Sequence, residues 1–289
     1  MEELTVTNEN RPSNYVVFGL VFEDRQIFRA TVKCVLGDEL DDGAYVVSEK
    51  ENRMGSAIYN KIRFDVYGEG DKIYSLDMQN GYAGEMIRNR LVYYACRAVG
   101  GQEVRNFGYD ALKTCVVTFI FERGPRGGGQ LLTRYYMAAE IDGAIVKYSD
   151  LLSVVELNLG LYKATGNANL NVLCEFLRVQ TTDDLRKFRE KHGGGGFGEM
   201  LYGKYMKVAA DAERIEKVSS MQLYEAKSRV KYLSESDVNF LWEENQEKLA
   251  INAIKKGLAL ELISELTELD IERIKKLKEQ TEKNHEVQI

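Results

Sequence analysis

The N-terminal part of the chain carries apolar residues at helical spacing, which predicts helices before the first strand. Residues 15–36 form two such runs, and the polar stretch 23–25 separates them, so we expect two short helices. Gly37 suits a helix C-cap, and the "DELDDG" that follows it suits a loop. A further helical run at 84–99 predicts another helix, which the glycine pair at 100–101 ends.

Shorter runs rich in β-branched and aromatic residues predict strands. The most apolar of them, "KTCVVTFIFER" at 113–123, suits the centre of a sheet, because a strand covered on both faces carries nearly continuous apolar sequence. The other predicted strands lie at 44–48, in a hairpin over 62–79, and at 131–141 and 153–159. Strands that alternate with helices indicate the α/β class, here a mixed β-sheet flanked by helices.

The strand signals stop beyond about residue 168, where helical patterns take over. A glycine-rich break at 193–198 precedes a charged, helical stretch over 199–280 that contains no proline. We therefore predict an α/β domain over 1–165 and an all-helical C-terminal region over 166–289.

The end of the helical region, about 249–279, resembles a helix-turn-helix unit, with Asp270 as the N-cap of its last helix. That helix carries basic residues that could contact DNA, namely Arg273, Lys275, Lys276 and Lys278. A small helical clip or a dimer contact explains the same pattern equally well. The same region carries an apolar stripe that another surface must cover, either the α/β domain or a second copy of the chain. The stripe comprises Leu249, Ile251, Ile254, Leu258, Leu262 and Leu266.

Composition argues against several classes of protein and of site. The net charge of −6 argues against a globally basic nucleic-acid binder, although a local basic channel remains compatible with it. No apolar run approaches the about 18 residues of a membrane helix, and the polar N-terminus differs from a signal peptide, so we expect no membrane association. Four scattered cysteines fit buried thiols in a reducing, cytoplasmic environment. Two histidines argue against zinc sites and histidine-based triads.

The hairpin "IRFDVYGEGDKIYSLDMQ" carries two acids within its strands, Asp65 and Asp77, although aspartate is a poor strand former. A three-residue loop centred on Gly70 would pair Asp65 with Ser75 and make Asp77 its diagonal neighbour, with the backbones about 7–8 Å apart. Two carboxylates at that separation could share one Mg²⁺ ion. Gln79 follows on the same face, where it could contact an attacking water. A sheet with a solvated acidic face explains the same residues without any site.

Several segments of the chain resemble the PD-(D/E)XK nuclease superfamily, and within it the Rpn-type recombination-promoting nucleases, also labelled putative transposases. The family pattern is an "RLDVY" strand, a turn, "EMQ" and a helix with paired tyrosines. The matching segments here are "RFDVY" at 63–67, "DMQ" at 77–79, Tyr93 and Tyr94, the strand 115–121, "RYY" at 134–136, "ELNLG" at 156–160 and the tail from "KKGLALELISELTELD" onward.

The resemblance implies a restriction-endonuclease-like core and a Mg²⁺-dependent DNA endonuclease, with Mn²⁺ as a possible substitute. Asp65 and Asp77 would be the metal ligands, and Gln79 would stand where the wider superfamily has lysine. Asp77 replaces the family's usual glutamate and is one methylene shorter. Because Gln79 is neutral, the metal and arginine must supply more of the positive charge in the transition state.

Arginines around this site are candidates for phosphate contacts. Arg63 lies on the first strand of the hairpin, Arg90 on the helix after it, and Arg126 in the loop "GPRGGG". Solvated charge or ion pairing explains Arg63 and Arg90 equally well, and a surface loop explains Arg126. Glu23 could complete the metal site, but an exposed turn residue is the simpler interpretation.

We expect DNA as the partner and a homodimer as the assembly. One metal site cuts one strand per engagement, whereas a symmetric dimer would present two sites to opposite strands. The helical region would contribute to the dimer interface. The alternative is a catalytically weak or inactive relative that acts as a DNA-binding, assembly or regulatory protein.

Overall fold

The computed structural model describes residues 4–52, 62–82, 87–102, 108–123 and 129–220, and in the C-terminal part 246–247, 250–251, 253–254, 259–267 and 269–286. The chain divides into two compact units, Met1–Ser220 and Met221–Ile289. The boundary that we predicted near residue 165 falls inside the first of these units. Within the described ranges, none of the helices is both long and apolar enough to span a lipid bilayer.

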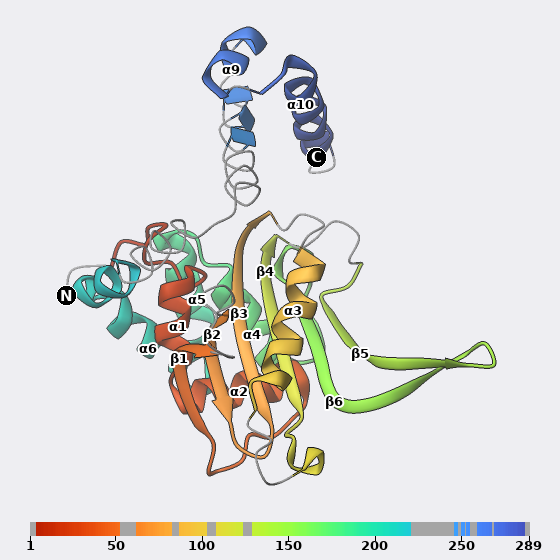
Figure 1. The fold of residues 1–289 in the computed structure, drawn as a ribbon. Coiled ribbons are helices and arrows are strands. Elements are labelled where there is room, and N and C mark those ends of the chain that lie inside the picture. The colour runs from red at the N-terminus through yellow and green to blue at the C-terminus, as the bar shows by residue number, and fades with distance from the viewer. Residues whose placement is uncertain are drawn as a thin grey trace. The chain divides into compact units, whose positions relative to one another are not determined.

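A six-stranded mixed sheet forms the centre of the first unit (Figure 1), in the order β1-β2-β3-β4-β6-β5. The first three strands are antiparallel, β3, β4 and β6 are mutually parallel, and β5 returns antiparallel along β6. The strands are β1 (Tyr45–Asn52), β2 (Ile62–Glu69), β3 (Ile73–Tyr82), β4 (Cys115–Arg123), β5 (Leu132–Ile141) and β6 (Ala144–Asn158). The apolar strand β4 is interior, as its sequence predicts.

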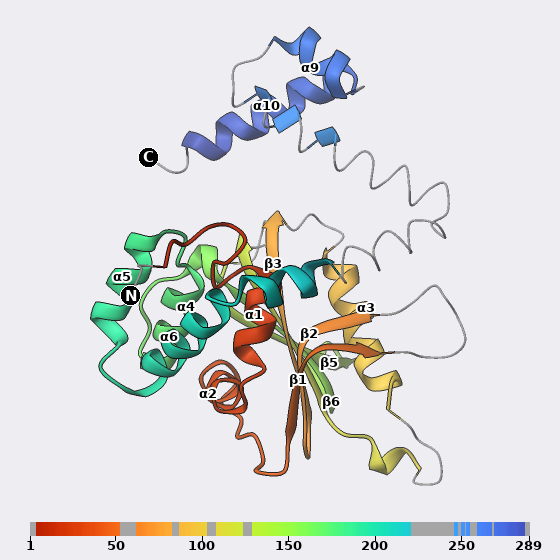
Figure 2. The same ribbon diagram turned by 90° about the vertical axis from the view of Figure 1, so that its left-hand side faces the viewer.

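Helices cover both faces of this sheet, with α3 on one side and the remaining helices of the unit on the other (Figure 2). They are α1 (Tyr15–Phe22), α2 (Arg25–Leu36), α3 (Ile87–Gly100), α4 (Ala168–Leu177), α5 (Thr182–His192) and α6 (Gly196–Ala209), with 3₁₀ turns at Tyr109–Ala111 and Leu159–Leu161. The predicted break between the first two helices is confirmed. It occurs because the Asp24 side chain caps α2, accepting hydrogen bonds from the N–H groups of Gln26 and Ile27.

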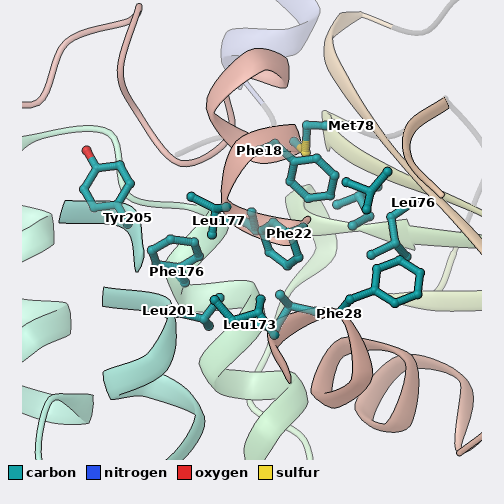
Figure 3. Packing of buried hydrophobic residues seen from close by; sticks show 14 of the residues in the cluster. Phe18, Phe22, Phe28, Leu76, Met78, Leu173, Phe176, Leu177, Leu201 and Tyr205 are labelled. Atoms are coloured by element: carbon teal, nitrogen blue, oxygen red, sulfur yellow. The ribbon is translucent and has the colours of Figure 1, made fainter. Parts of the chain in front are cut away.

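Aromatic side chains of α1 and α4 form the centre of the larger core (Figure 3). The rings of Phe18 and Phe22 stack at 4.3 Å between centroids, and Phe176 lies 6.5 Å from Phe22 and 5.8 Å from Tyr205 of α6. All of these rings are at most 2% exposed. Helices α4–α6 therefore belong to the same folded unit as the sheet, which explains why the division falls after them.

The hairpin turn differs from the prediction. The strands pair as Tyr67↔Ser75 and Glu69↔Ile73, so the loop is the three residues 70–72 and not a loop centred on Gly70. The loop between α2 and β1 contacts this turn: the Asp41 carboxylate accepts a hydrogen bond of 2.9 Å from the N–H of Asp71. A Cβ atom at Gly70 would lie only 1.5 Å from Asp41 Oδ2, so a larger residue here would have to displace the Asp41 side chain.

The second unit contains α9 (Leu260–Thr267) and α10 (Ile271–Glu286), joined by a short turn as predicted. Asp270 caps α10, since its Oδ1 accepts a 2.7 Å hydrogen bond from the N–H of Arg273. The predicted apolar stripe is confirmed in part. Ile251 and Ile254 pack against a buried set, whereas Leu262 is 42% exposed, and the side chains at 249, 258 and 266 lie outside the described part of the chain. The buried set is Ala250, Ile263, Ile274 and Leu277. Two of the proposed DNA-contacting residues form ion pairs, Arg273 with Glu247 and Lys275 with Glu272.

Gly70→Ala should destabilise the chain, because the new methyl group must displace the Asp41 carboxylate from the hairpin turn. We expect a loss of about 1–3 kcal/mol in the free energy of unfolding, measured by denaturant titration. Gly166→Ala is the control, since nothing lies within 4 Å of its added Cβ. Equal effects of the two substitutions would show that the contact with Asp41 does not constrain the turn.

Candidate active site

The two acids of the hairpin stand opposite each other at the point where the β2–β3 ladder ends. The last backbone pair is Val66↔Leu76, and one further step in this register places Asp65 across from Asp77. The N–H of Asp65 donates to Asp77 Oδ1 at 3.3 Å, and the N–H of Met78 donates to Asp65 Oδ2 at 2.7 Å. Each carboxylate thus accepts a hydrogen bond from the backbone of the opposite strand.

The alternation of side chains along β2 reverses at Asp65. Ile62 and Phe64 belong to the core under α3, whereas Val66 belongs to the core on the other face. Strict alternation along a regular strand would place all three on one face. β1 pairs with β2 on either side of this position, at Ser48↔Val66 and at Lys50↔Phe64. The site therefore lies at an irregularity of β2. At this position the N–H of Asp65 donates to the Asp77 carboxylate and not to the backbone of a neighbouring strand.

Asp77 is buried, with 2% of its surface exposed, so the expectation of a solvated acidic face is wrong for this residue. The hydroxyl of Ser75 donates to Asp77 Oδ2 at 3.1 Å. Burial raises the pKa of the Asp77 carboxyl well above its usual range, and the nearby charge of Asp65 raises it further. Hydrogen bonds from the Asp65 N–H and Ser75 and the charge of Arg90 oppose these effects without cancelling them. The site therefore favours binding either a proton or a cation.

Arg90 on α3 supplies positive charge beside the acids. Its Nη1 donates to Gln79 Oε1 at 3.1 Å, and its Nη2 donates to the Tyr94 hydroxyl oxygen at 3.1 Å. The guanidinium carbon also lies 5.0 Å from the centroid of the Tyr94 ring. That ring packs edge-on against Phe64 and Phe119, with centroids 5.8 and 5.6 Å away. The sheet core therefore holds Tyr94, and Tyr94 in turn holds Arg90.

Two other predicted residues, Arg63 and Glu23, do not join this pair of acids. Arg63 precedes Phe64, whose side chain faces α3, so alternation directs Arg63 to the opposite face of the sheet. Arg126 lies outside the described residues. Glu23 accepts a 2.7 Å hydrogen bond from the Ser48 hydroxyl and forms a 2.8 Å ion pair with Arg214. Glu23 therefore neutralises Arg214 of the helical layer.

One further buried acid, Glu156, lies at the same level of the parallel strands as Asp77, and we did not predict it as a site residue. Phe119 pairs with Asp77 on one side and with Glu156 on the other, so Glu156 is two strands from Asp77, about 10 Å between backbones. Glu156 is 6% exposed and accepts a 3.1 Å hydrogen bond from the Tyr135 hydroxyl. Burial raises the pKa of its carboxyl. The sequence signal was an acid at the end of a buried strand, where α/β proteins bind ligands.

Asp65 and Asp77 fit a divalent cation by the chemistry of their donors. Mg²⁺ usually takes one or two carboxylates and completes its shell with waters and substrate phosphates. A carboxylate offers about four lone-pair directions, so one or two hydrogen bonds do not exhaust its capacity to ligate. Among the residues that the structure describes, no group of three or more His, Cys, Asp and Glu side chains could hold a metal. The ion would therefore depend on this single pair of carboxylates.

Asp77→Asn should stabilise the chain at neutral pH without divalent cations, because it removes a buried charge that its surroundings disfavour. A raised pKa means that the folded chain binds a proton that the unfolded chain does not, so the stability of the wild type falls as pH rises above about 4, the ordinary value for aspartate. The melting temperature of the variant should exceed that of the wild type in this range and converge with it at lower pH.

The same variant should lose stabilisation by Mg²⁺ or Mn²⁺, which in the wild type amounts to about 2.7 kcal/mol at a hundredfold excess over Kd. Asp71→Asn, on the exposed hairpin loop, is the matched control and should resemble the wild type in both measurements. A variant that is less stable at every pH, or that still gains stability from the cation, would contradict the assignment.

Comparisons with known proteins assign the chain to no family. No family model matches the chain. Neither the curated proteins nor the solved structures contain a match to it. A reaction can therefore be assigned only from these residues, their arrangement and the sequence resemblance described above.

Proposed function

We propose that the chain is a Mg²⁺-dependent endonuclease that hydrolyses phosphodiester bonds of DNA, related to the Rpn-type nucleases. The observation that carries this proposal is the opposed pair of Asp65, which is half-buried, and Asp77, which is buried, beside Arg90. A structural sheet gains nothing from two like charges in this position, and perturbed carboxyl groups cluster at functional sites. A divalent cation is the ligand that two opposed carboxylates favour most.

The order of elements agrees with the proposal. The acids lie on an antiparallel hairpin, a helix with paired tyrosines follows, and the apolar strand β4 then runs parallel to β3. This is the order of motifs in the resemblance to PD-(D/E)XK nucleases. We therefore propose that β1–β4 with α1 and α3 form a restriction-endonuclease-like core.

The residues of the site would have different roles in catalysis. Asp65 and Asp77 would hold Mg²⁺, which supplies Lewis-acid activation of the phosphate and of a water nucleophile when bound. Because Gln79 Oε1 accepts from Arg90, the amide nitrogen of Gln79 is the group directed to other partners. Gln79 therefore acts as a hydrogen-bond donor to a phosphate oxygen, and it cannot accept a proton from water.

Arg90 takes the electrostatic role that lysine has in the wider superfamily. A guanidinium has five N–H donors, and two hydrogen bonds to Gln79 and Tyr94 leave donors for a phosphate. Arg90 is exposed despite its contacts, so a substrate can reach it. Its charge opposes the developing negative charge of the transition state. Arg126 would contact the DNA backbone outside the reacting group, whereas Arg63 faces the opposite side of the sheet and has no part in this proposal.

Purified chain should nick supercoiled plasmid in the presence of Mg²⁺ or Mn²⁺ and not in EDTA. Asp65→Asn and Asp77→Asn should each abolish cleavage, because each removes one of two anionic ligands. Arg90→Met should lower kcat by about 10²–10³-fold, a magnitude typical for losing one electrostatic contact to the transition state. Glu69→Gln is the control, since this acid lies at the other end of β2, bonded to Tyr45, Tyr67 and Lys113.

Cleavage by either aspartate variant at the wild-type rate would refute the site. If the wild type binds the cation but cleaves neither duplex nor single-stranded DNA, the chain is instead a catalytically inactive relative.

A further inference from the structure

Strands β5 and β6 continue together beyond the rest of the sheet as a two-stranded arm, residues 137–149 (Figure 1). Of β6, residues 152–158 pair with β4, whereas 144–149 pair with β5 alone in the described part of the chain. The tip is a two-residue turn in which Asp142 and Gly143 both have positive φ, 52° and 79°. This turn type favours a regular, twisted hairpin.

The two faces of the arm differ in chemistry. The cross-strand pairs Ala139↔Val146 and Ile141↔Ala144 place four apolar residues on one face. Alternation from these pairs puts Met137 and Tyr148 on the same face, at the register shift where Met137 pairs with Ser149. The pairs Glu140↔Ile145 and Ala138↔Lys147 place the charges on the other face. Lys147 also lies over the Tyr136 ring on that side, 6.0 Å from its centroid. We name the first of these the apolar arm face.

The apolar arm face is open to solvent in the single chain. Met137 is 46% exposed, Ile141 57%, Val146 41% and Tyr148 73%. An isolated two-stranded ribbon is at best marginally stable in water. A hairpin that extends away from its sheet with an uncovered apolar face therefore needs a partner surface to be stable.

We propose that the apolar arm face is the contact through which two copies of this chain form a homodimer, the arms packing face to face about a two-fold axis. The face is self-complementary, because its cross-strand pairs each join a large residue to an alanine. A two-fold axis would set Ile141 or Val146 of one copy against the alanines of the other.

The size of the face agrees with this partner. At the observed exposures the four large side chains leave about 400–500 Å² open on each copy. Two faces together would bury about 800–1,000 Å², which at its upper end reaches the lower limit of about 1,000 Å² for a specific interface. The charges disfavour DNA as the occupant, since the arm carries one lysine against two acids, Glu140 and Asp142.

The experiment compares two isoleucines that lie close to the turn, on opposite faces of the arm. Ile141→Lys places charge on the apolar arm face, whereas Ile145→Lys, at 67% exposure, places the same charge on the other face. Sedimentation equilibrium on the full chain should give twice 32.9 kDa for the wild type and for Ile145→Lys. For Ile141→Lys, and for Val146→Lys on the same face, the dimer dissociation constant should rise at least about 100-fold.

Circular dichroism should show all the variants folded, since each replaced side chain is exposed in the single chain. A monomeric wild type would overturn the proposal. A dimer that Ile141→Lys leaves intact would also overturn it and would move the interface to another surface, such as the helical region. Equal dissociation by Ile141→Lys and Ile145→Lys would overturn it as well, because the effect would not depend on the face.

Discussion

Two reciprocal hydrogen bonds between carboxylates and backbone determine the local structure around the site. Asp77 accepts from the N–H of Asp65, and Asp65 accepts from the N–H of Met78. These contacts take over where the β2–β3 ladder ends, so the strands can separate without leaving their N–H groups unsatisfied. The two acids are thereby held against each other by the same contacts that keep the hairpin together.

This arrangement costs electrostatic energy that other parts of the fold offset. A buried carboxylate beside a second one favours neutralisation, and Arg90 provides only part of it. The aromatic contacts of Tyr94 position Arg90, and Asp41 contacts the loop of the hairpin that carries the two acids. The site is thus poised to gain free energy from a cation.

The sequence predicted which helices and strands form better than it predicted how they pair and pack. The helix break at Asp24 and the interior strand β4 followed from local capping and apolar content. The hairpin register did not, because the turn also contacts Asp41, thirty residues from the loop residue that it binds. The first unit extends to Ser220 because amphipathic helices after the sheet pack on α1, and periodicity alone does not identify the surface that a helix will cover.

The candidate site shows the same limit. Asp65, Asp77, Gln79 and Arg90 were all predicted, and the structure brings these four together. The burial of Asp77 was not predicted, since alternation distinguishes the two faces of a strand but does not reveal that α3 covers the second face. The partner of Gln79 was also hidden, because the contact with Arg90 depends on how α3 crosses the sheet.

The central claim is that Asp65 and Asp77 together ligate one divalent cation. Anomalous diffraction from crystals of the full chain grown with Mn²⁺ tests it most directly. The account predicts one strong Mn²⁺ peak per chain within ligand distance of a carboxylate oxygen from both residues, and no such peak in crystals of Asp77→Asn. A wild-type map with Mn²⁺ bound only elsewhere, or with none at a concentration that supports cleavage, would contradict it.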